Sequence, residues 1–297
     1  MNFWKIKKIA IAYAFIIPTL LIMGVFIFYP MAKAFYLSFF SNDYSGWKFV
    51  GIQNFKELLT DEVFKTSLIN SIKYLIVVPV IIVLSLILAI LVEPQIPAIT
   101  FFRVCFYIPV VTSMIVVGIT WKIIFNEDAG ILNQMLMRIG IIKEPIHWFT
   151  NMHLALYTVM TVTTWKGLGY YMVVFIAGLR AIPKETIEAS MMDGAKRWQQ
   201  LLFVKIPMLW HSISLVAIVS SIAALQVFEE IFVMTEGKPL YATSTLVYNI
   251  YKTGFDPSGD LRMGYASAQG VVLFFMVLTF TYLSLKFLKK GEYTPEE

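Results

Sequence analysis

The segment that decides the fold lies between two long apolar runs and reads Arg180-Ala-Ile-Pro-Lys-Glu-Thr-Ile-Glu-Ala-Ser-Met-Met-Asp-Gly-Ala-Lys-Arg-Trp-Gln-Gln-Leu-Leu-Phe-Val-Lys-Ile-Pro207. Pro183 suits the first turn of a helix, and the acidic Glu185 that follows favours a helix N-terminus. No helix breaker occurs from Lys184 to Asp193, so a short helix is predicted there. Gly194 then permits a sharp turn at the end of this helix.

This short helix has an apolar stripe that needs a partner. Ile187, Met191 and Ala195 are spaced i, i+4, i+8, and the acidic Glu188 and Asp193 accompany them. Ten residues are too few to fold alone, and anionic lipid headgroups would repel the acidic side chains. Docking into a groove of a soluble protein therefore explains the mixed acidic and apolar face better than a position on the membrane surface.

Composition places the segment in a membrane protein. The chain has 297 residues, of which 58% are hydrophobic and only 14% charged, whereas soluble domains are about 45–50% apolar and about 25% charged. The net charge of +5 is carried by short loops between apolar runs, without a basic cluster interleaved with aromatics. This pattern argues against a nucleic-acid partner and for a chain embedded in a lipid bilayer.

Six apolar stretches approach the roughly 20 residues that a membrane-spanning helix needs. We predict spans at residues 9–29, 72–92, 104–125, 154–179, 209–228 and 265–285. The first run is longer than the apolar core of a signal peptide and no small-residue cleavage site follows it, so we interpret it as a retained span. A second helical stretch, 196–205, is predicted to lead through Pro207 into the fifth span.

Basic residues orient the predicted bundle. If the N-terminus is cytoplasmic, the cytoplasmic segments hold 12 of the 24 Lys and Arg residues, namely Lys5, Lys7, Lys8, Arg103, Arg180, Lys184, Lys196, Arg197, Lys205, Lys286, Lys289 and Lys290. Those segments are about half as long as the external loops, so the positive-inside rule favours this orientation. With an even number of spans, both termini are predicted to be cytoplasmic.

The loop also resembles a known motif. The stretch Glu188-Ala-Ser-Met-Met-Asp-Gly-Ala195, followed by Val204-Lys-Ile-Pro207, resembles the EAA loop of ABC importer permeases. The EAA pattern is Glu-Ala-Ala, three residues, Gly, nine residues, Ile, one residue, Leu-Pro, and each spacing is kept here. The departures are conservative, with Ser190 for the second Ala, Val204 for Ile and Ile206 for Leu.

The resemblance covers nearly the whole chain and is to the first of the two permeases in carbohydrate importers. It implies an all-α membrane protein with six transmembrane helices, the type I ABC importer permease fold and a cytoplasmic coupling helix. It divides the chain into an N-terminal part (1–67), a five-helix core with the EAA loop (68–290) and a cytoplasmic tail (291–297). The resembling segments are Pro18, 26–30, 36–39, 49–55, 70–74, 165–167, 177–183, 226–235 and 264–268, whereas 237–239 departs slightly.

The resemblance further implies partners: a second permease subunit, a cytoplasmic ATPase dimer and an external binding protein that delivers a sugar-like solute. The chain has no Gly-x-x-x-x-Gly-Lys-Ser/Thr loop, so it is expected to be a transport subunit and not an enzyme, without a cofactor. The ATPase-coupling residues that the motif implies are Glu185, Glu188, Ala189, Ser190, Asp193, Gly194, Ala195 and Pro207. Glu188 would contact an ATPase arginine, and Gly194 would form the turn.

The solute pathway is harder to read from the sequence. Lys166 lies near the middle of the fourth span, where an ionisable residue is a functional candidate, unless that span begins later and leaves it shallower. Trp165, Tyr170 and Tyr171 flank it and could stack on a sugar ring or pack at the interface. Three residues close the fifth span and could bind hydroxyls or form a solvated outer rim: Gln226, Glu229 and Glu230.

Two other classes of function compete with the importer. A secondary transporter driven by an ion gradient would explain six spans and Lys166, but not the acidic amphipathic loop, and no inverted repeat is visible. A membrane enzyme is disfavoured because no catalytic cluster falls on a common face. The single cysteine, Cys105, and the three histidines lack metal-site spacing.

Overall fold

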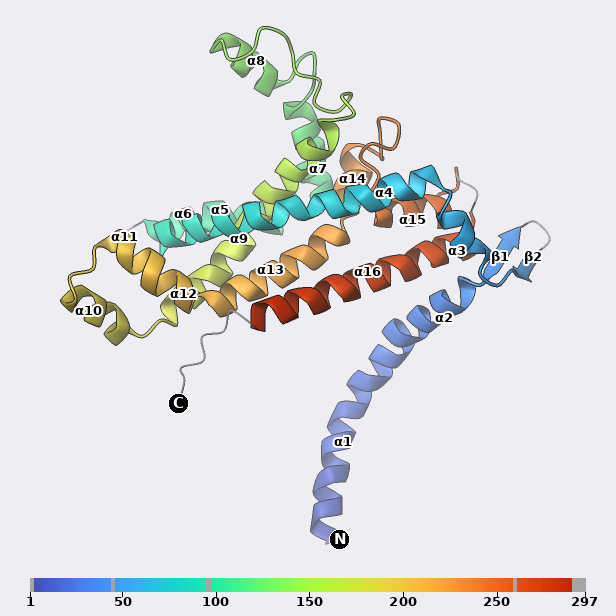
Figure 1. The fold of residues 1–297 in the computed structure, drawn as a ribbon, viewed down its shortest axis with the longest axis horizontal. Helices are drawn as coiled ribbons and strands as arrows, with labels where there is room; N and C mark the ends of the chain where they lie inside the picture. Colours follow the sequence, from blue (N-terminus) through green and yellow to red (C-terminus); the bar gives the residue numbers. More distant parts are fainter. Residues whose placement is uncertain (1–2, 44–45, 94–97, 259–260, 290–297) are drawn as a thin grey trace. The chain divides into compact units, whose positions relative to one another are not determined.

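The computed structural model describes residues 3–43, 46–93, 98–258 and 261–289, and Figure 1 shows an almost entirely helical chain. Two compact units divide it. Unit 1 comprises Met1–Asp61 with Ile250–Phe274, and unit 2 comprises Glu62–Asn249 with Phe275–Glu297. The predicted tail at 291–297 lies outside the described residues.

Unit 1 begins with a long interrupted helix. Helix α1 (Phe3–Met23) passes through a π-helical turn (Gly24–Phe28) into α2 (Tyr29–Leu37). Pro30 lacks an N–H and its ring crowds the carbonyl of residue 26, so the wider turn before it relieves the clash. The predicted end of the first span at Tyr29 is therefore wrong, because the helix continues to Leu37 beyond the apolar run.

A small motif follows in unit 1, between the first two predicted spans. Strands β1 (Phe40–Asp43) and β2 (Gly46–Phe49) pair antiparallel, with Phe40 opposite Phe49. Helix α3 (Gln53–Leu58) comes next. The Asn54 amide donates to the carbonyls of Ser38 and Phe40 at 2.8 and 2.9 Å, which fixes α3 to the end of α2 and the hairpin.

The start of α16 (Met263–Lys289) closes the motif. The Arg262 guanidinium donates to both carboxylate oxygens of Glu57 at 2.6 Å each. The Tyr265 hydroxyl donates to Asp61 at 2.6 Å, and the Asn42 amide bonds the carbonyl of Leu261 at 2.7 Å. These side-chain bonds join segments about 200 residues apart.

The core of unit 2 is built from three packed stretches of helix. Helix α4 (Glu62–Lys73) continues through a 3₁₀ turn (Tyr74–Ile76) into α5 (Val77–Val92), which packs on α9 (Ala155–Arg180) and α13 (Trp210–Leu225). The 3₁₀ turn precedes Pro79, whose missing N–H breaks the regular helix ladder. The fully buried side chains of this core include Tyr74, Val159, Val162, Met172 and Phe175.

The predicted third span is not one straight helix. Helix α6 (Ile99–Val111) and helix α7 (Met114–Ile124) meet at an angle of 99°. Thr112 and Ser113 between them have extended backbone, with ψ of 136° and 137°. Composition alone could not reveal this bend, because the apolar run continues through it. Helix α14 (Glu229–Met234) packs on α7.

Short helices join the longer ones at both ends of unit 2. Helix α8 (Ile131–Arg138) lies before α9, and α10 (Lys184–Met192) lies after it. They lie at opposite ends of α9 in Figure 1. Helix α11 (Arg197–Gln200), a π turn (Leu201–Lys205) and α12 (Ile206–Met208) lead into α13 at a bend of 64°. Helix α15 (Leu246–Gly254) precedes α16.

Three helical stretches of the described chain are long and apolar enough to cross a membrane, Tyr13–Leu37, Glu62–Val92 and Met263–Lys286, and the two bent pairs raise the number to five. The predicted span at 154–179 corresponds to α9, which is not among the five. Its 26 residues extend about 39 Å, more than the roughly 30 Å of a bilayer core. Its lower hydropathy follows from the threonines, glycines and Lys166 that it carries.

Candidate functional site

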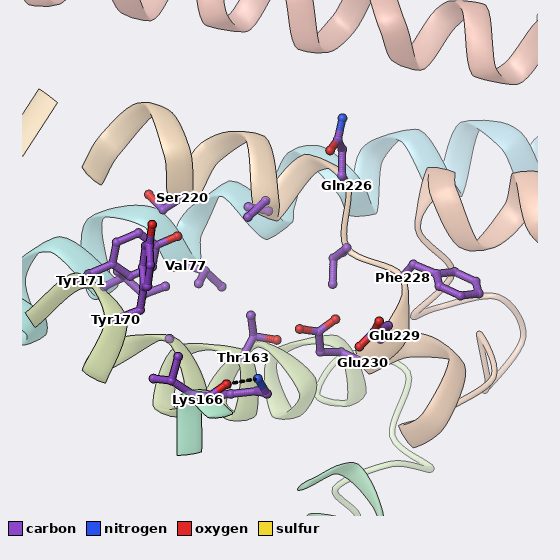
Figure 2. A pocket seen from close by; sticks show the side chains of 16 residues that line it. Val77, Thr163, Lys166, Tyr170, Tyr171, Ser220, Gln226, Phe228, Glu229 and Glu230 are labelled. Atoms are coloured by element: carbon purple, nitrogen blue, oxygen red, sulfur yellow. Dashed lines mark hydrogen bonds between the residues drawn. The ribbon is translucent and has the colours of Figure 1, made fainter. Parts of the chain in front are cut away.

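A cavity of about 550 Å³ lies in unit 2 among α5, α6, α9, α13 and α14. Figure 2 shows the side chains that line it. Its walls combine apolar residues with hydroxyl, amide and charged groups, a composition typical of binding sites for small polar molecules. The lining residues are Val77, Ile81, Val110, Thr163, Lys166, Gly167, Tyr170, Tyr171, Ser220, Ala223, Ala224, Gln226, Val227, Phe228, Glu229 and Glu230.

Lys166 and Glu230 form the charged part of the wall. The Lys166 ammonium donates to the carbonyl of Val110 in α6 at 3.3 Å. In Figure 2 it lies on the same side of the cavity as Thr163 and the Glu230 carboxylate. Glu230 belongs to the short helix α14, outside the candidate spans. Burial and the neighbouring Glu229 raise the pKa of Glu230, while Lys166 opposes the rise.

Aromatic hydroxyl groups form the other part of the wall. The Tyr170 and Tyr171 rings meet edge to face, with centroids 5.1 Å apart. The hydroxyl groups of Tyr74 and Thr163 are hydrogen-bonded at 2.6 Å, which links the 3₁₀ turn before α5 to α9. This wall can stack against a sugar ring and hydrogen-bond its hydroxyls.

Close packing of α9 on its neighbours sets the shape of the cavity. Gly169 faces the backbone carbonyl of Phe106 in α6, where a Cβ would overlap the carbonyl oxygen. Only glycine allows the two helices to approach this closely. The approach holds the cavity-lining stretch of α9 against α6.

The structure brings together six of the seven residues that the sequence suggested for the solute pathway. Lys166, Tyr170, Tyr171, Gln226, Glu229 and Glu230 all line the cavity. Trp165 instead lines a separate groove of about 370 Å³ between α5 and α9. Successive positions on α9 point about 100° apart, which turns Trp165 away from Lys166.

At the other end of α9, the predicted coupling segment folds as a helix and a reversal. Helix α10 ends in a Schellman motif, in which Gly194 N–H donates to Met191 and Ala195 N–H to Ser190, both at 3.0 Å. Gly194 has φ of +78°, a value that favours glycine. The predicted helix at 184–193 and turn at Gly194 therefore match the structure.

The exposed side chains of α10 include both acidic and apolar groups. Glu185, Glu188, Ala189 and Asp193 are exposed, and Met191 and Met192 are 57% and 89% exposed. Ser190 faces inward and donates to the carbonyl of Ile187 at 2.6 Å. Ala195 is half-buried after the turn, and Pro207 is the second residue of α12. Among the described residues, the acidic and apolar side chains of α10 therefore form a mixed, exposed surface.

The cavity and the predicted coupling segment both lie in a region that matches one known protein family. A family profile described as "Binding-protein-dependent transport system inner membrane component" matches residues 74–291, which include the cavity residues and the coupling segment. The chain belongs to this permease family. The match confirms the predicted family and the predicted class of transport subunit.

Several permeases of bacteria resemble this permease over nearly its full length. It is 33% identical to the probable ABC transporter permease protein YurN of Bacillus subtilis, over 95% of this chain and 97% of that one. It is 33% identical to the lactose transport system permease protein LacF of Rhizobium radiobacter, over 91% of each chain. It is 31% identical to the sn-glycerol-3-phosphate transport system permease protein UgpA of Agrobacterium fabrum, over 94% of each.

A solved structure confirms the fold. A chain of a bacterial ABC transporter involved in the import of the acidic polysaccharide alginate superposes on the permease with a TM-score of 0.83 and 20% identity. The superposition covers 98% of this chain and 99% of that chain. The predicted type I importer permease fold is therefore correct.

The permease also has an ordered loop, between α7 and α9, that the sequence did not predict. Residues 126–152, between the predicted third and fourth spans, enclose α8 and a buried asparagine. The Asn133 amide donates to the carbonyls of Glu127 and Ile146 at 3.0 Å each. Its oxygen accepts from the Ile146 N–H at 3.2 Å and the Trp148 indole at 2.9 Å. Four bonds to one side chain hold the two halves of the loop together.

Glu127 is the second organising residue of this loop. Its carboxylate accepts from the backbone N–H groups of Phe149 and Thr150 at 3.0 and 2.9 Å and from His147 at 2.8 Å. Burial opposes ionisation of Glu127, but the bonds from His147, Thr150 and Phe149 outweigh it and lower its pKa to about 2. A polar segment with scattered aromatics gave only a weak sequence signal, because its bonds join residues up to 23 positions apart.

Proposed function

We propose that the permease forms one side of the translocation pathway of an ABC importer for a saccharide, and that the cavity in unit 2 is part of this pathway. The observation that carries the proposal is the continuity of α9. This one helix contributes Lys166, Tyr170 and Tyr171 to the cavity, and it ends three residues before α10 begins. A displacement of α10 therefore reaches the cavity wall through a single rigid element.

The α10 surface supports docking to a separate ATPase. Its exposed methionines provide apolar contact area, and Glu188 provides an anionic group for an arginine of the partner. Helix-in-groove docking of this kind suits a short helix that is too small to fold alone. When the ATPase dimer closes, α10 moves with it and the cavity changes its accessible side as a rigid body.

Partners and solute follow from the relatives. The similar proteins include permeases named for lactose, arabinooligosaccharides and sn-glycerol-3-phosphate. A related structure holds an alginate importer in complex with an alginate-pentasaccharide-bound periplasmic protein. By extension, this permease would receive its saccharide from an external binding protein, pair with a second permease and draw on a separate ATPase for energy.

The proposal also includes the membrane orientation of the chain and its division into functional parts. The chain belongs to a family of inner-membrane components, and the basic residues of its loops support cytoplasmic termini. The parts we propose are 1–67, 68–290 and the tail 291–297. The family profile, which begins at residue 74, supports assigning transport to the second part.

The test of the coupling role is uptake by the assembled transporter. Glu188→Lys reverses the docking charge, and Gly194→Pro cannot adopt the observed φ of +78°. Both variants should insert in the membrane but lose uptake, and Glu188→Lys should also lose the co-purifying ATPase. Glu144→Lys, an equal charge reversal on the exposed loop at 126–152, should keep both. Normal uptake by Glu188→Lys and Gly194→Pro would refute the proposed coupling.

An ion-gradient-driven transporter is the competing function. Such a protein would need no soluble ATPase, so purification without one, combined with uptake driven by an imposed ion gradient in its absence, would favour it. The exposed acidic and apolar surface of α10 favours the importer instead.

A further inference from the structure

The charges in the cavity wall are unequal. Two carboxylates, Glu229 and Glu230, face one ammonium, Lys166, so the formal charge of the lining residues is −1. The tyrosine, serine and threonine hydroxyls add no charge. Lys122 approaches the carbonyl of Val233 at the far end of α14, at 3.5 Å, and does not line the cavity.

The single ammonium of the wall is already engaged. Lys166 donates to the Val110 carbonyl at 3.3 Å, and Glu230 is close enough to interact with it electrostatically. An anionic solute would therefore compete with a carbonyl and a carboxylate for the same cation.

The two carboxylates, in contrast, are open to hydrogen-bond donors. In the described part of unit 2, Glu230 receives a bond from its own backbone N–H, and no side-chain donor bonds either carboxylate. The nearby Tyr74 hydroxyl is bonded to Thr163 instead. Glu229 is exposed and Glu230 is half-buried, and a half-buried carboxylate with no side-chain donor gains from any donor that a ligand brings.

We propose that the permease favours uncharged or cationic saccharides over anionic ones, and that Glu229 and Glu230 are the residues that discriminate. Sugar hydroxyls and ammonium groups donate hydrogen bonds to carboxylates, whereas phosphate esters and uronates at neutral pH are repelled. The inference rests on the proposed function, because it requires the cavity to lie on the solute's route.

The test measures the charge preference of the cavity directly in the assembled transporter in proteoliposomes. Ala223 lines the cavity and is exposed, so Ala223→Cys in a Cys105→Ser background provides a thiol there. Reaction rates are compared for two thiosulfonate reagents of similar size, one with a trimethylammonium group and one with a sulfonate. Gln226→Cys is a second cavity position in case the first variant assembles poorly.

The cationic reagent should react at least about tenfold faster, after correction for the intrinsic rates of the two reagents. The combined Glu229→Gln and Glu230→Gln substitutions should reduce this preference several-fold, while Glu144→Gln on the exposed loop should leave it unchanged. Equal rates, faster reaction of the sulfonate, or a preference that survives both glutamine substitutions would overturn the inference.

A separate readout distinguishes failure of the proposed function. Attachment of either reagent at residue 223 should block saccharide uptake, because the adduct would occupy the cavity. If uptake continued with the thiol fully modified, the cavity would not be on the pathway and both proposals would fail. If uptake stopped but the charge preference did not depend on Glu229 and Glu230, only the inference about solute charge would fail.

Discussion

Gly169 of α9 lies against the backbone carbonyl of Phe106 in α6, with no space for a side chain between them. This contact joins the cavity-lining helix to the first half of the bent pair α6–α7. Because the obstacle is backbone and not a flexible side chain, the neighbour cannot move aside at low cost.

Gly169→Ala should therefore destabilise unit 2, by about 1–3 kcal/mol as for overpacking in a filled core. Thermal unfolding of the purified transporter in detergent measures the effect as a lower Tm. Gly270→Ala is the matched control, since a Cβ there meets nothing within 4 Å. Equal Tm values for both variants would contradict the observed packing.

Asn133→Ala should disorder the loop at 126–152. The substitution removes four hydrogen bonds and leaves the partly buried N–H groups of Ile146 and Trp148 without their acceptor, at a cost of up to about 1–3 kcal/mol each. Limited proteolysis should cut within the loop of the variant and spare it in the wild type. The neighbouring Gln134→Ala, which removes one exposed bond of 3.3 Å, should behave like the wild type.

The same loop should lose order in acid. The pKa of Glu127 is lowered in the folded state from 4.5 to about 2, so its ionised form stabilises the loop at pH values above the unfolded pKa. This contribution is lost as the pH falls from about 4.5 to about 2. Fluorescence of Trp148 should report the change over that range.

Glu127→Gln supplies the control for the acid transition. The variant has no charge to lose at this position, so its fluorescence should change less over the same range and its loop should be less stable at pH 7. A transition of unchanged size in the variant would assign the acid effect to another group.

The ion pair between Glu57 and Arg262 should contribute modestly to unit 1. Its two bonds of 2.6 Å have favourable bidentate geometry, but the side chains are 39% and 35% exposed. Solvent screening therefore limits the pair to about 1 kcal/mol. A double-mutant cycle with Glu57→Gln and Arg262→Gln measures the coupling, which should shrink in 1 M salt, where the Debye length is about 3 Å. A coupling of zero at low salt would show that the pair adds nothing.

Local sequence was sufficient to predict the structure of the coupling segment. Pro183 fixed the start of α10, and Gly194 fixed its end, because the φ of +78° observed there is one that glycine tolerates. Most apolar runs also located their helices. These features depend on neighbours within one or two turns, so periodicity and single residues are enough to predict them.

Other features depended on distant residues and were missed. The bend between α6 and α7 falls inside one apolar run. The first helix extends to Leu37, past the end of its own apolar run. The bonds of Glu127 and Asn133 reach across up to 23 positions. No local pattern marks such contacts, because the partner that satisfies a polar side chain is chosen by the fold.

The sequence by itself determined that this protein is a helical membrane permease with an acidic, glycine-terminated helix between two long apolar runs, since hydropathy, helix caps and motif spacing are local properties of the chain. Only the tertiary structure decided that Lys166, Tyr170 and the pair Glu229–Glu230 share one cavity while Trp165 faces a different groove. The physical reason is that helix rotation and close approach, as at Gly169, set which side chains meet, and both arise from packing between segments far apart in the chain.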